Sequence, residues 1–414
     1  MDILTDLQYR GLSYQVTEGL EDRLEKGPLT LYNGFDPTAD SLTVGNLVAV
    51  LLLRRFQLAG HPPIALVGGG TGLIGDPGGK TEERALNPLD TVEMWTEKVK
   101  SQVAPFLDFD SGSHAAQMVN NYDWLKNLTA IDLMREVGKH FPVPYMLAKD
   151  SVASRLETGI SYTEFSYMIL QAYDFLHLNQ SHQCELQTGG SDQWGNITAG
   201  TDLIRRALSR PAFGLTCPLV TTAAGVKFGK TESGAIWLDA TKTTPYQFYQ
   251  FWINTEDASV VSYLKFFTFL DKTELEDLAK VTEESPEQRQ AQRRLAEEVT
   301  TLVHGKEAVT KAEKISRALF YGELQDLTLD EIEQAFNDVP SHTMTTPELP
   351  LVDLLVAANI SSSKRQARQD IENGAIYLNG TRTTTLDQTL RLSDGLHAKY
   401  LIIRRGKNKY YLIK

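Results

Sequence analysis

The sequence is poor in cysteine and has no long apolar run. It has only two cysteines in 414 residues, and no Cys or His spacing suggests a zinc site, so we expect neither a disulfide framework nor a tightly bound metal. The longest strongly apolar run, residues 47–53, is too short to span a bilayer. The first ten residues carry Asp2 and Asp6 and lack the basic-then-apolar order of a signal peptide. We therefore expect a cytoplasmic protein with no membrane partner.

The chain also lacks the positive net charge that is common in nucleic-acid-binding proteins. Its formal net charge is −12, from 41 Lys and Arg against 53 Asp and Glu. Residues 350–414 nevertheless contain 11 basic and 5 acidic side chains, which makes this tail +6 and the remainder −18. The tail is therefore a candidate polyanion-binding module, although a basic surface on a solubilising domain would have the same composition.

Length and periodicity indicate several domains. In residues 1–222, short apolar runs that end in glycine alternate with helical periodicities, which predicts an α/β domain built on a parallel sheet. Residues 223–337 begin with a Lys-rich loop and are otherwise helical in pattern. Residues 338–349 are rich in Pro, Ser and Thr and suit a linker of limited order. Residues 350–414 predict a small third domain, in which Ser362 can cap a helix that ends at Glu372.

The first segment that can carry chemistry is residues 31–46. A predicted strand meets a glycine and a polar loop, and a helix follows with Gly45 in its first turn. Backbone N–H groups and the helix dipole attract phosphate at such a position. An ordinary strand–loop–helix connection with a capping residue is an equally good interpretation of this segment alone.

The second segment, residues 68–81, is rich in glycine. Three glycines satisfy the G-x-G-x-x-G pattern of dinucleotide-binding enzymes, which makes an NAD-dependent dehydrogenase an alternative of another class: Gly70, Gly72 and Gly75. In a dinucleotide fold the third glycine opens a continuous helix, whereas Asp76 and Pro77 follow here at once and would break it. A P-loop also fails, because Ile74 stands where its first glycine must be. A glycine-lined wall of a small-molecule pocket remains.

Three further segments place polar side chains among apolar or glycine-rich neighbours. In the predicted helix 161–178, a polar stripe follows helical spacing at Tyr167, Gln171 and Asp174. Such a stripe most often faces solvent, but the strongly apolar surroundings of Asp174 favour a pocket. Residues 187–196 are predicted to form a glycine-rich strand end. This strand end can bind an amine or a ribose, or it can simply be a tight turn. Residues 227–231 carry two lysines. They can be a solvated surface loop or a loop that binds pyrophosphate.

Taken in order, these segments resemble the bacterial tyrosyl-tRNA synthetases over essentially the whole chain. The resemblance rests on the joint occurrence of Tyr-Asn-Gly-Phe-Asp-Pro-Thr at 32–38, Gly-Gly-Ser-Asp-Gln-Trp-Gly-Asn at 189–196 and Lys-Phe-Gly-Lys-Thr at 227–231. It implies a class I synthetase with a Rossmann-like catalytic domain, a helical domain near the anticodon stem and an S4-like RNA-binding domain. It also implies a homodimer that loads tyrosine onto tRNA(Tyr) at the expense of ATP, which enters with Mg²⁺.

The resemblance also assigns residue roles. The tyrosine substrate would be bound by Tyr32, Asp76, Tyr167, Gln171, Asp174 and Gln193. ATP would be bordered by Gly34, Asp36, Gly45, Asn46, Gly190, Asp192 and Lys230. The residues acting on the phosphates would be Thr38, Thr43, Lys227, Lys230 and Thr231. RNA would contact Lys364, Arg365 and Arg368.

One position departs from the family pattern. Thr43 stands where the family signature normally begins with histidine, and Asn46 stands where it often ends with one. In the family the first histidine donates a hydrogen bond to the phosphates in the transition state, and loss of one such donor costs about 2.7–4 kcal/mol in other enzymes. Thr43 offers a shorter-reaching hydroxyl, helped by Thr38, so we expect slower adenylation rather than an inactive enzyme.

This departure leaves open a paralogue that binds structured RNA but no longer charges tRNA. The intact ATP-binding set, including Asp36, Asp192 and both lysines of residues 227–231, argues against it. The tryptophanyl enzyme is a closer rival with a similar fold. The pair of Tyr32 and Asp174, together with the basic tail, favours tyrosine.

Overall fold

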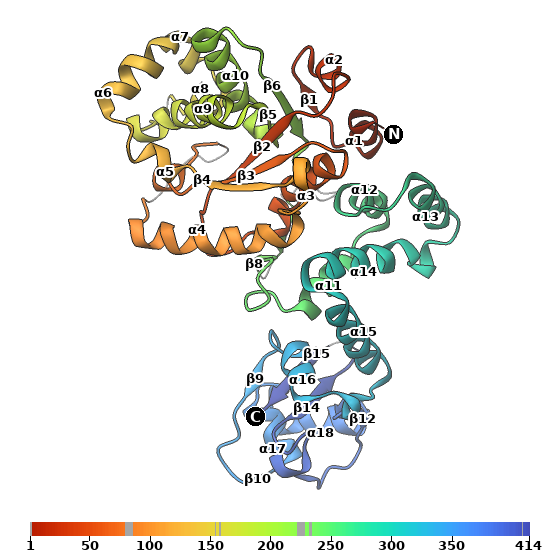
Figure 1. The fold of residues 1–414 in the computed structure, drawn as a ribbon. Coiled ribbons are helices and arrows are strands. Elements are labelled where there is room, and N and C mark those ends of the chain that lie inside the picture. Colours follow the sequence, from red (N-terminus) through yellow and green to blue (C-terminus); the bar gives the residue numbers. More distant parts are fainter. Residues whose placement is uncertain are drawn as a thin grey trace. The chain divides into compact units, whose positions relative to one another are not determined.

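The structure is a computed structural model that describes residues 2–78, 86–153, 155–156, 159–221, 228–231, 234–407 and 409–414. The chain forms two compact units (Figure 1). Unit 1 consists of Met1–Lys242 and Thr255–Leu295, and unit 2 consists of Thr243–Asn254 and Ala296–Lys414. Among the described residues, none of the helices has the length and apolarity needed to cross a membrane.

Unit 1 is built on a six-stranded sheet with the order β1-β6-β5-β2-β3-β4. Its strands are β1 Gln15–Val16, β2 Thr30–Phe35, β3 Pro63–Val67, β4 Gln117–Asn120, β5 Cys184–Gly190 and β6 Phe213–Cys217. All neighbouring pairs are parallel except β1 with β6, so the expected parallel sheet carries one short antiparallel edge strand. A separate two-stranded ribbon pairs β7 Lys230–Thr231 with β8 Gly234–Ala235.

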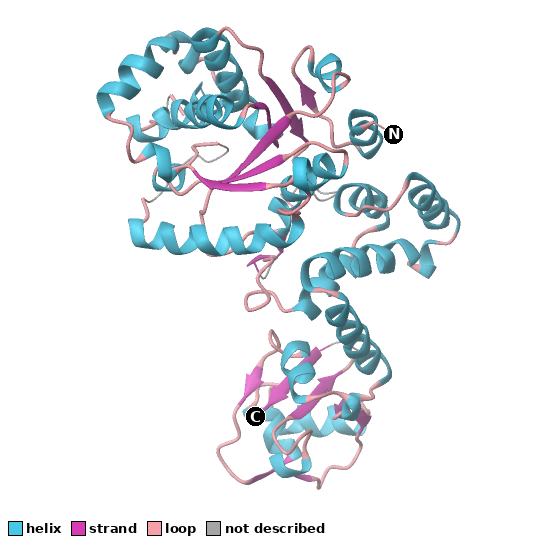
Figure 2. Ribbon diagram, in the orientation of Figure 1, coloured by secondary structure: helices cyan, strands magenta, loops and turns pink. Residues whose placement is uncertain are grey.

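Helices cover both faces of this sheet (Figure 2). Unit 1 contains α1 Ile3–Arg10, α2 Leu20–Leu24, α3 Val44–Leu58, α4 Leu89–Val103, α5 Tyr122–Leu125, α6 Ala130–Asp132, α7 Val143–Leu147, α8 Asp150–Ala153, α9 Tyr162–His182, α10 Trp194–Leu208, α12 Asp257–Phe267 and α13 Lys272–Glu284. Because the sheet is covered on both sides, every residue of β3 is buried, which explains its continuous apolar run. Ser161 caps α9 by accepting a hydrogen bond from the backbone N–H of Glu164.

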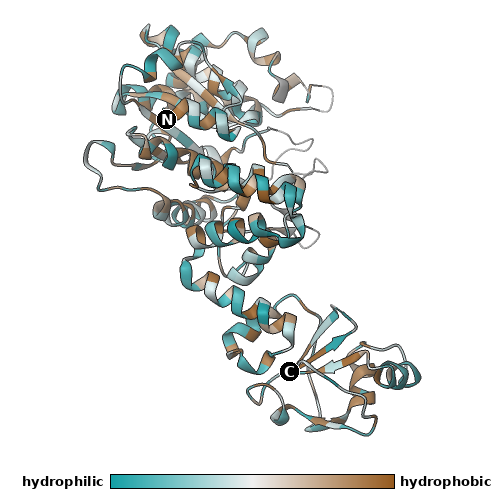
Figure 3. Cartoon of the chain, turned by 90° about the vertical axis from the view of Figure 1, so that its right-hand side faces the viewer, coloured by the Kyte–Doolittle hydropathy of each residue, from teal (hydrophilic) through white to brown (hydrophobic). Residues whose placement is uncertain are grey.

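Unit 2 combines helices with the small C-terminal α+β domain. Its helices are α11 Pro245–Ile253, α15 Lys306–Tyr321, α16 Leu329–Ala335, α17 Leu351–Ala357 and α18 Lys364–Glu372, while α14 Gln290–His304 begins in unit 1 and ends in unit 2. Its strands are β9 Ser341–His342, β10 Glu348–Pro350, β11 Ile376–Leu378, β12 Thr381–Arg382, β13 Thr389–Arg391, β14 Leu401–Arg405 and β15 Lys409–Ile413. Hydrophilic and hydrophobic residues alternate along α15 in the pattern of an amphipathic helix (Figure 3).

Two local features of unit 2 differ from the sequence expectation. Residues 338–349, expected as a linker, contain β9, which pairs with β15, and most of β10, which pairs with β13. The cap of α18 is Ser363 rather than Ser362, and its hydroxyl accepts from the backbone N–H of Gln366. Consecutive serines offer equivalent capping oxygens, so the local sequence alone does not distinguish them.

One hydrophobic core in unit 2 joins the helical part to the C-terminal sheet. It contains Ile315 of α15, Ile332 of α16 and Phe336 together with Ile402 and Leu412 from β14 and β15. A second core lies wholly within the C-terminal domain and is built mainly from α17, α18 and the sheet. The helices that precede residue 338 therefore share a core with the C-terminal domain that follows.

The shared core predicts that Phe336→Ala loosens both parts of unit 2 together. Phe336 is 2% exposed and its ring lies 5.6 Å from that of Tyr410, so its truncation should cost about 3–5 kcal/mol. Hydrogen exchange read by mass spectrometry should show faster exchange in α15, α16, β14 and β15. Leu351→Ala, which is confined to the second core, is the matched control and should leave α15 protected. Unchanged exchange of β14 and β15 in Phe336→Ala would contradict a shared core.

Candidate active site

A cavity of about 760 Å³ opens at the carboxyl ends of the central strands of unit 1. It brings together the predicted residues Tyr32, Gly34, Asp36, Thr38, Thr43, Gly45, Asn46, Asp76, Tyr167, Gln171, Asp174, Gly190, Asp192 and Gln193. Lys227 lies outside the described residues. The backbone of Lys230 and Thr231 forms β7, but the structure does not describe their side chains.

The buried carboxylate of Asp174 lies in the wall of this cavity. It is 2% exposed and accepts two hydrogen bonds, from Asn121 Nδ2 at 2.8 Å and from Trp124 Nε1 at 2.7 Å. Burial raises the pKa of Asp174 to about 7, although both hydrogen bonds act in the opposite direction. The carboxylate of Asp174 is therefore held in a fixed orientation and titrates near neutral pH.

A chain of hydrogen bonds connects Asp174 to the opposite wall. The second Nδ2 hydrogen of Asn121 is donated to Thr71 Oγ1 at 2.8 Å, and Thr71 donates to Asp36 Oδ1 at 2.7 Å. Tyr167 donates its phenolic hydrogen to the other oxygen of Asp36 at 2.7 Å. Position 68, directly after β3, requires glycine, because a Cβ on Gly68 would lie 2.0 Å from Asp36 Oδ1.

A second polar group lies between α9 and the end of β5. Gln193 Nε2 donates to Asp76 Oδ2 at 2.7 Å, while Gln193 Oε1 accepts from Gln171 Nε2 at 3.3 Å. The polar stripe of α9 therefore faces the cavity rather than solvent, because Tyr167, Gln171 and Asp174 all line it.

Three polar atoms of the cavity wall are buried and have no hydrogen-bond partner among the described residues: Tyr32 Oη, Gln171 Oε1 and Gln187 Oε1. Burial, followed by the nearby carboxylate of Asp174, raises the pKa of Tyr32 well above its ordinary value, so its hydroxyl keeps its proton. An unsatisfied buried polar atom costs about 1–3 kcal/mol. Such atoms in a cavity wall indicate a ligand with matching polar groups.

The N-terminus of α3 forms another part of the wall. Thr43 precedes the helix, and both its backbone N–H and its hydroxyl donate to Asn46 Oδ1, at 3.0 and 2.9 Å. Gly45 in the first turn is exposed and lines the cavity at the positive end of the helix dipole, whereas the N–H of Val44 donates to Ile236 and that of Asn46 donates to Thr43. This geometry suits a phosphate group.

The charges of the described wall are all negative. It carries Asp36, Asp76, Asp174 and Asp192, and the described lining residues include no Lys or Arg. Within the described ranges, no group of three or more acidic, His or Cys side chains is placed to hold a metal ion. The cavity therefore favours a cationic group such as an ammonium, and a polyphosphate would need cations from elsewhere.

Two families of known proteins match the chain. The family described as tRNA synthetases class I (W and Y) matches residues 24–321, and the one described as the tyrosine–tRNA ligase SYY-like C-terminal domain matches residues 331–413. Tyrosine–tRNA ligase 1 of Bacillus anthracis is 61% identical over 417 residues and 100% of both chains. The chain belongs to the tyrosine–tRNA ligases.

Two further relatives agree with this family. The tyrosine–tRNA ligase of Bacillus caldotenax is 60% identical over 417 residues, again with 100% of both chains covered. A C-terminally truncated mitochondrial tyrosyl-tRNA synthetase from Aspergillus nidulans has a similar structure, with a TM-score of 0.70 and 30% identity. The match covers 77% of this chain and 94% of that one.

The structure also bears on the dehydrogenase alternative. Within the glycine-rich segment the chain makes one short 3-10 turn at Thr71–Leu73 and then leaves helical geometry, so no helix begins at Gly75. A dinucleotide-binding enzyme of the Rossmann type would need that helix to hold the pyrophosphate. The G-x-G-x-x-G match in this tyrosine–tRNA ligase is therefore not a dinucleotide-binding turn, and the described residues of this segment that line the cavity are Thr71 and Asp76.

Sequence reasoning missed three residues that support the site of this ligase. Thr71, Asn121 and Trp124 orient the carboxylates of Asp36 and Asp174, although they lie at least 35 residues from their partners. The available signal was weak: Asn121 follows a short strand that ends in Asn120. Nothing in the local pattern indicates that this asparagine bonds a carboxylate on α9.

The raised pKa of Asp174 predicts a pH-dependent stability. The folded chain keeps a proton on Asp174 that the unfolded chain releases near pH 3.8, so the stability contributed by this group falls as pH rises from about 4 to about 7. The asparagine of the Asp174→Asn variant cannot ionise, so the stability of this variant does not fall with pH for this reason. Its free energy of unfolding relative to the unmodified chain should therefore rise by about 1 kcal/mol from pH 6 to pH 8.

This difference is measured by urea unfolding of both proteins at the two pH values. The substitution can also weaken a hydrogen bond to Asn121. This cost is the same at both pH values, so it cancels when the two stability differences are compared. A stability difference that is independent of pH would show that the pKa of Asp174 is not raised.

Proposed function

We propose that the cavity of unit 1 binds tyrosine and ATP, forms tyrosyl-adenylate, and then transfers tyrosine to tRNA(Tyr). The main support for this proposal is that the hydroxyl of Tyr32, which is buried and has no partner among the described residues, lies in the same wall as the fixed carboxylate of Asp174. The phenol of tyrosine can donate to Asp174 and accept from Tyr32. Phenylalanine would leave the hydroxyl of Tyr32 unpaired and would give Asp174 no donor, and in such a site this costs roughly 10⁴–10⁵ in specificity, a magnitude established with an enzyme of this kind.

The ammonium of tyrosine would be bound by the acceptors between α9 and β5. Asp76 provides a carboxylate, and Gln171 Oε1 is buried without a partner among the described residues. The phenol of Tyr167 keeps its proton, because burial, followed by the charges of Asp36 and Asp76, raises its pKa well above the ordinary value. The wall thus offers several oxygen acceptors to a group that carries three donors.

ATP would lie along the N-terminus of α3 and the end of β5. Gly34 and Gly45 would admit the flat nucleotide close to the backbone, while Asp36, Gly190 and Asp192 would border the ribose and adenine. Because the described wall is acidic, the phosphates need positive charge from Mg²⁺ that enters with ATP and from the lysines at 227 and 230. Thr38 and Thr231 would add hydroxyl donors.

The chemistry consists of two substitutions. An oxygen of the tyrosine carboxylate attacks the α-phosphorus, and the bond to pyrophosphate breaks. The terminal ribose hydroxyl of tRNA then attacks the carbonyl carbon of the adenylate and releases AMP. The side chains of the wall act by positioning the reactants and by stabilising charge, since none of them needs to form a covalent bond.

The C-terminal α+β domain would bind tRNA as an S4-like module. Lys364, Arg365 and Arg368 belong to α18, where Lys364 is exposed and forms an ion pair of 2.7 Å with Asp353. The net charge of +6 over residues 350–414 supports a phosphate-binding surface.

A homodimer is supported by apolar side chains that are exposed in unit 1 and gather in residues 131–162: Ile131, Met134, Val143, Leu147, Leu156 and Tyr162. Where such side chains form one contiguous patch, the patch is typical of an interface between subunits. A second copy related by a twofold axis would cover it.

The decisive experiment is amino-acid-dependent ATP–pyrophosphate exchange with tyrosine, phenylalanine and tryptophan in parallel. It measures the first chemical step without tRNA, and we expect exchange with tyrosine alone. Exchange with tryptophan would favour the tryptophanyl alternative. No exchange with any of the three would favour a paralogue that binds RNA without charging it.

Thr43 provides a second test. Its hydroxyl donates a hydrogen bond to Asn46. A histidine at this position would be longer and could reach the phosphates. Thr43→His restores the donor of the family signature and should raise the rate of adenylate formation in single-turnover kinetics, by up to roughly 10²–10³-fold. Thr43→Val, which removes the hydroxyl at equal size, is the control and should lower the rate. A Thr43→His rate that is unchanged or reduced would contradict this role.

A further inference from the structure

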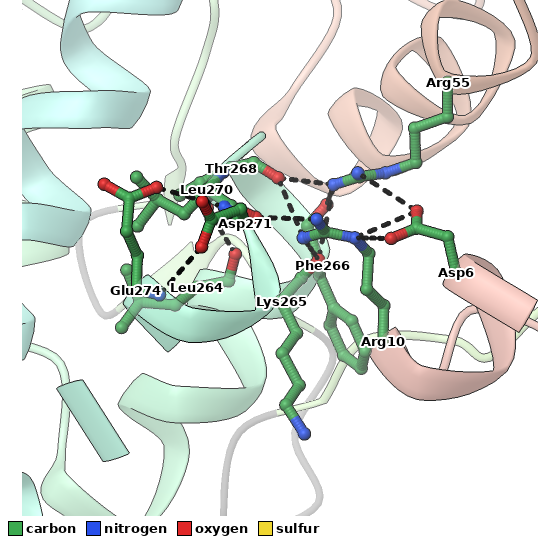
Figure 4. Close-up of polar contacts among 10 residues, drawn as sticks. All are labelled: Asp6, Arg10, Arg55, Leu264, Lys265, Phe266, Thr268, Leu270, Asp271 and Glu274. Carbon is green, nitrogen blue, oxygen red and sulfur yellow. Dashed lines mark hydrogen bonds and ion pairs between the residues drawn. The ribbon is translucent and has the colours of Figure 1, made fainter. Parts of the chain in front are cut away.

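Two buried arginines hold the end of α12 in unit 1. Arg10 of α1 and Arg55 of α3 are 6% and 4% exposed, and both donate to the backbone carbonyls of Lys265 and Thr268 (Figure 4). Asp6 neutralises part of this charge at 2.9 Å from Arg10 and 3.7 Å from Arg55. We call these three side chains the arginine clamp. Since the last carbonyls of a helix lack internal partners, the clamp satisfies the C-terminus of α12.

The same turns of α12 hold an aromatic side chain from the segment 228–231. The rings of Tyr263 and Phe267, which lie four residues apart on one face of the helix, are 4.6 and 5.3 Å from the ring of Phe228. Phe228 is 5% exposed. The hydroxyl of Tyr263 also donates to the carbonyl of Thr221 at 3.0 Å. We call Tyr263 and Phe267 the aromatic socket.

Phe228 and Gly229 in turn contact the first turn of α3. The carbonyl of Phe228 is 3.7 Å from the Cβ position of Gly45, and a Cβ on Gly229 would lie 2.5 Å from Val44 Cγ2. The φ angle of Gly229 is +79°, a conformation that favours glycine. The carbonyl of Gly229 accepts from Ile236, whose own carbonyl accepts from the N–H of Val44.

These contacts form a closed circuit. The N-terminus of α3 touches Phe228 and Gly229, Phe228 lies in the socket on α12, and α12 returns through the clamp to Arg55 in the last turn of α3. The clamp lies at the end of α3 opposite to the turn that faces the cavity. A shift of α12 would therefore move Phe228 relative to Gly45.

We propose that Arg55 is a positioning residue for the ATP side of the active site. Through Arg55 and Arg10, α12 is fixed so that the aromatic socket places Phe228 and Gly229 beside the phosphate-facing turn of α3. This inference rests on the proposed function. Tyr32, Asp76 and Asp174 take no part in the circuit, so the binding of tyrosine should be independent of it.

The test replaces Arg55 by methionine, which has no charge, and by lysine, which keeps a cation and one donor. In ATP–pyrophosphate exchange, Arg55→Met should lower kcat/KM for ATP by roughly 10- to 100-fold, since small displacements of reactants have effects of this size. The KM for tyrosine should stay unchanged, and Arg55→Lys should recover part of the loss. Equal losses for both substrates would indicate general damage and would overturn the proposal.

Arg23→Met is the matched control. Arg23 also bonds a carboxylate, that of Glu185 at 2.6 Å, and two backbone carbonyls, those of Gly27 and Pro28, but it lies outside the circuit. The Arg23→Met variant should have an unchanged kcat/KM for ATP. If Arg23→Met reproduced the ATP-specific loss, the loss of any arginine bonded to a carboxylate and backbone carbonyls would explain the result, and the proposal would fail.

Two substitutions in the socket keep the proposal testable if Arg55→Met does not fold. Tyr263→Leu and Phe267→Leu each remove one of the two rings that contact Phe228. Both should show the same ATP-specific loss, and normal ATP parameters in both would overturn the proposal. Absence of exchange in the unmodified enzyme would instead contradict the proposed function, so the two failures are distinguishable.

Discussion

The active site depends on one buried carboxylate that must be hydrogen-bonded. Asp174 lies on α9, and its partners Asn121 and Trp124 come from the end of β4 and from α5. Burying this charge without partners would cost several kcal/mol, so these elements must meet at the carboxyl edge of the sheet. Through Thr71 the same network fixes Asp36. The requirement to satisfy Asp174 therefore orders both the wall that carries Asp174 and the wall that carries Asp36.

The cavity that results is well suited to an amino acid and poorly suited to phosphate on its own. Its described wall is acidic, and phosphate is attracted only by the first turn of α3. Under the proposed function, positive charge would come from Mg²⁺ that enters with ATP and from the lysines at 227 and 230. Under the same proposal, the sheet edge and α9 would bind the amino acid, and the phosphate side would include Phe228 and Gly229, which are held by packing.

That packing involves residues far from any substrate. Burial, followed by the charge of Arg10, lowers the pKa of Arg55 to about 9, which shows how unfavourable this position is for a cation. The backbone carbonyls at the end of α12 and the carboxylate of Asp6 compensate for it. A buried pair of arginines is a specific way to join three helices, because each guanidinium has five donors in a fixed plane.

The sequence by itself determined which residue types stand at the strand ends and where the main helices begin. The glycines after β3 and at the end of β5, the start of a helix at Ser161 and the motifs at 32–38, 189–196 and 227–231 follow from local patterns and from family resemblance. The apolar surroundings of Asp174 favoured a pocket for the stripe of α9, but only the tertiary structure decided that Asn121 bonds Asp174 and that short strands form within residues 338–349. These outcomes depend on hydrogen bonds and burial between segments far apart in the chain, which a local pattern does not encode.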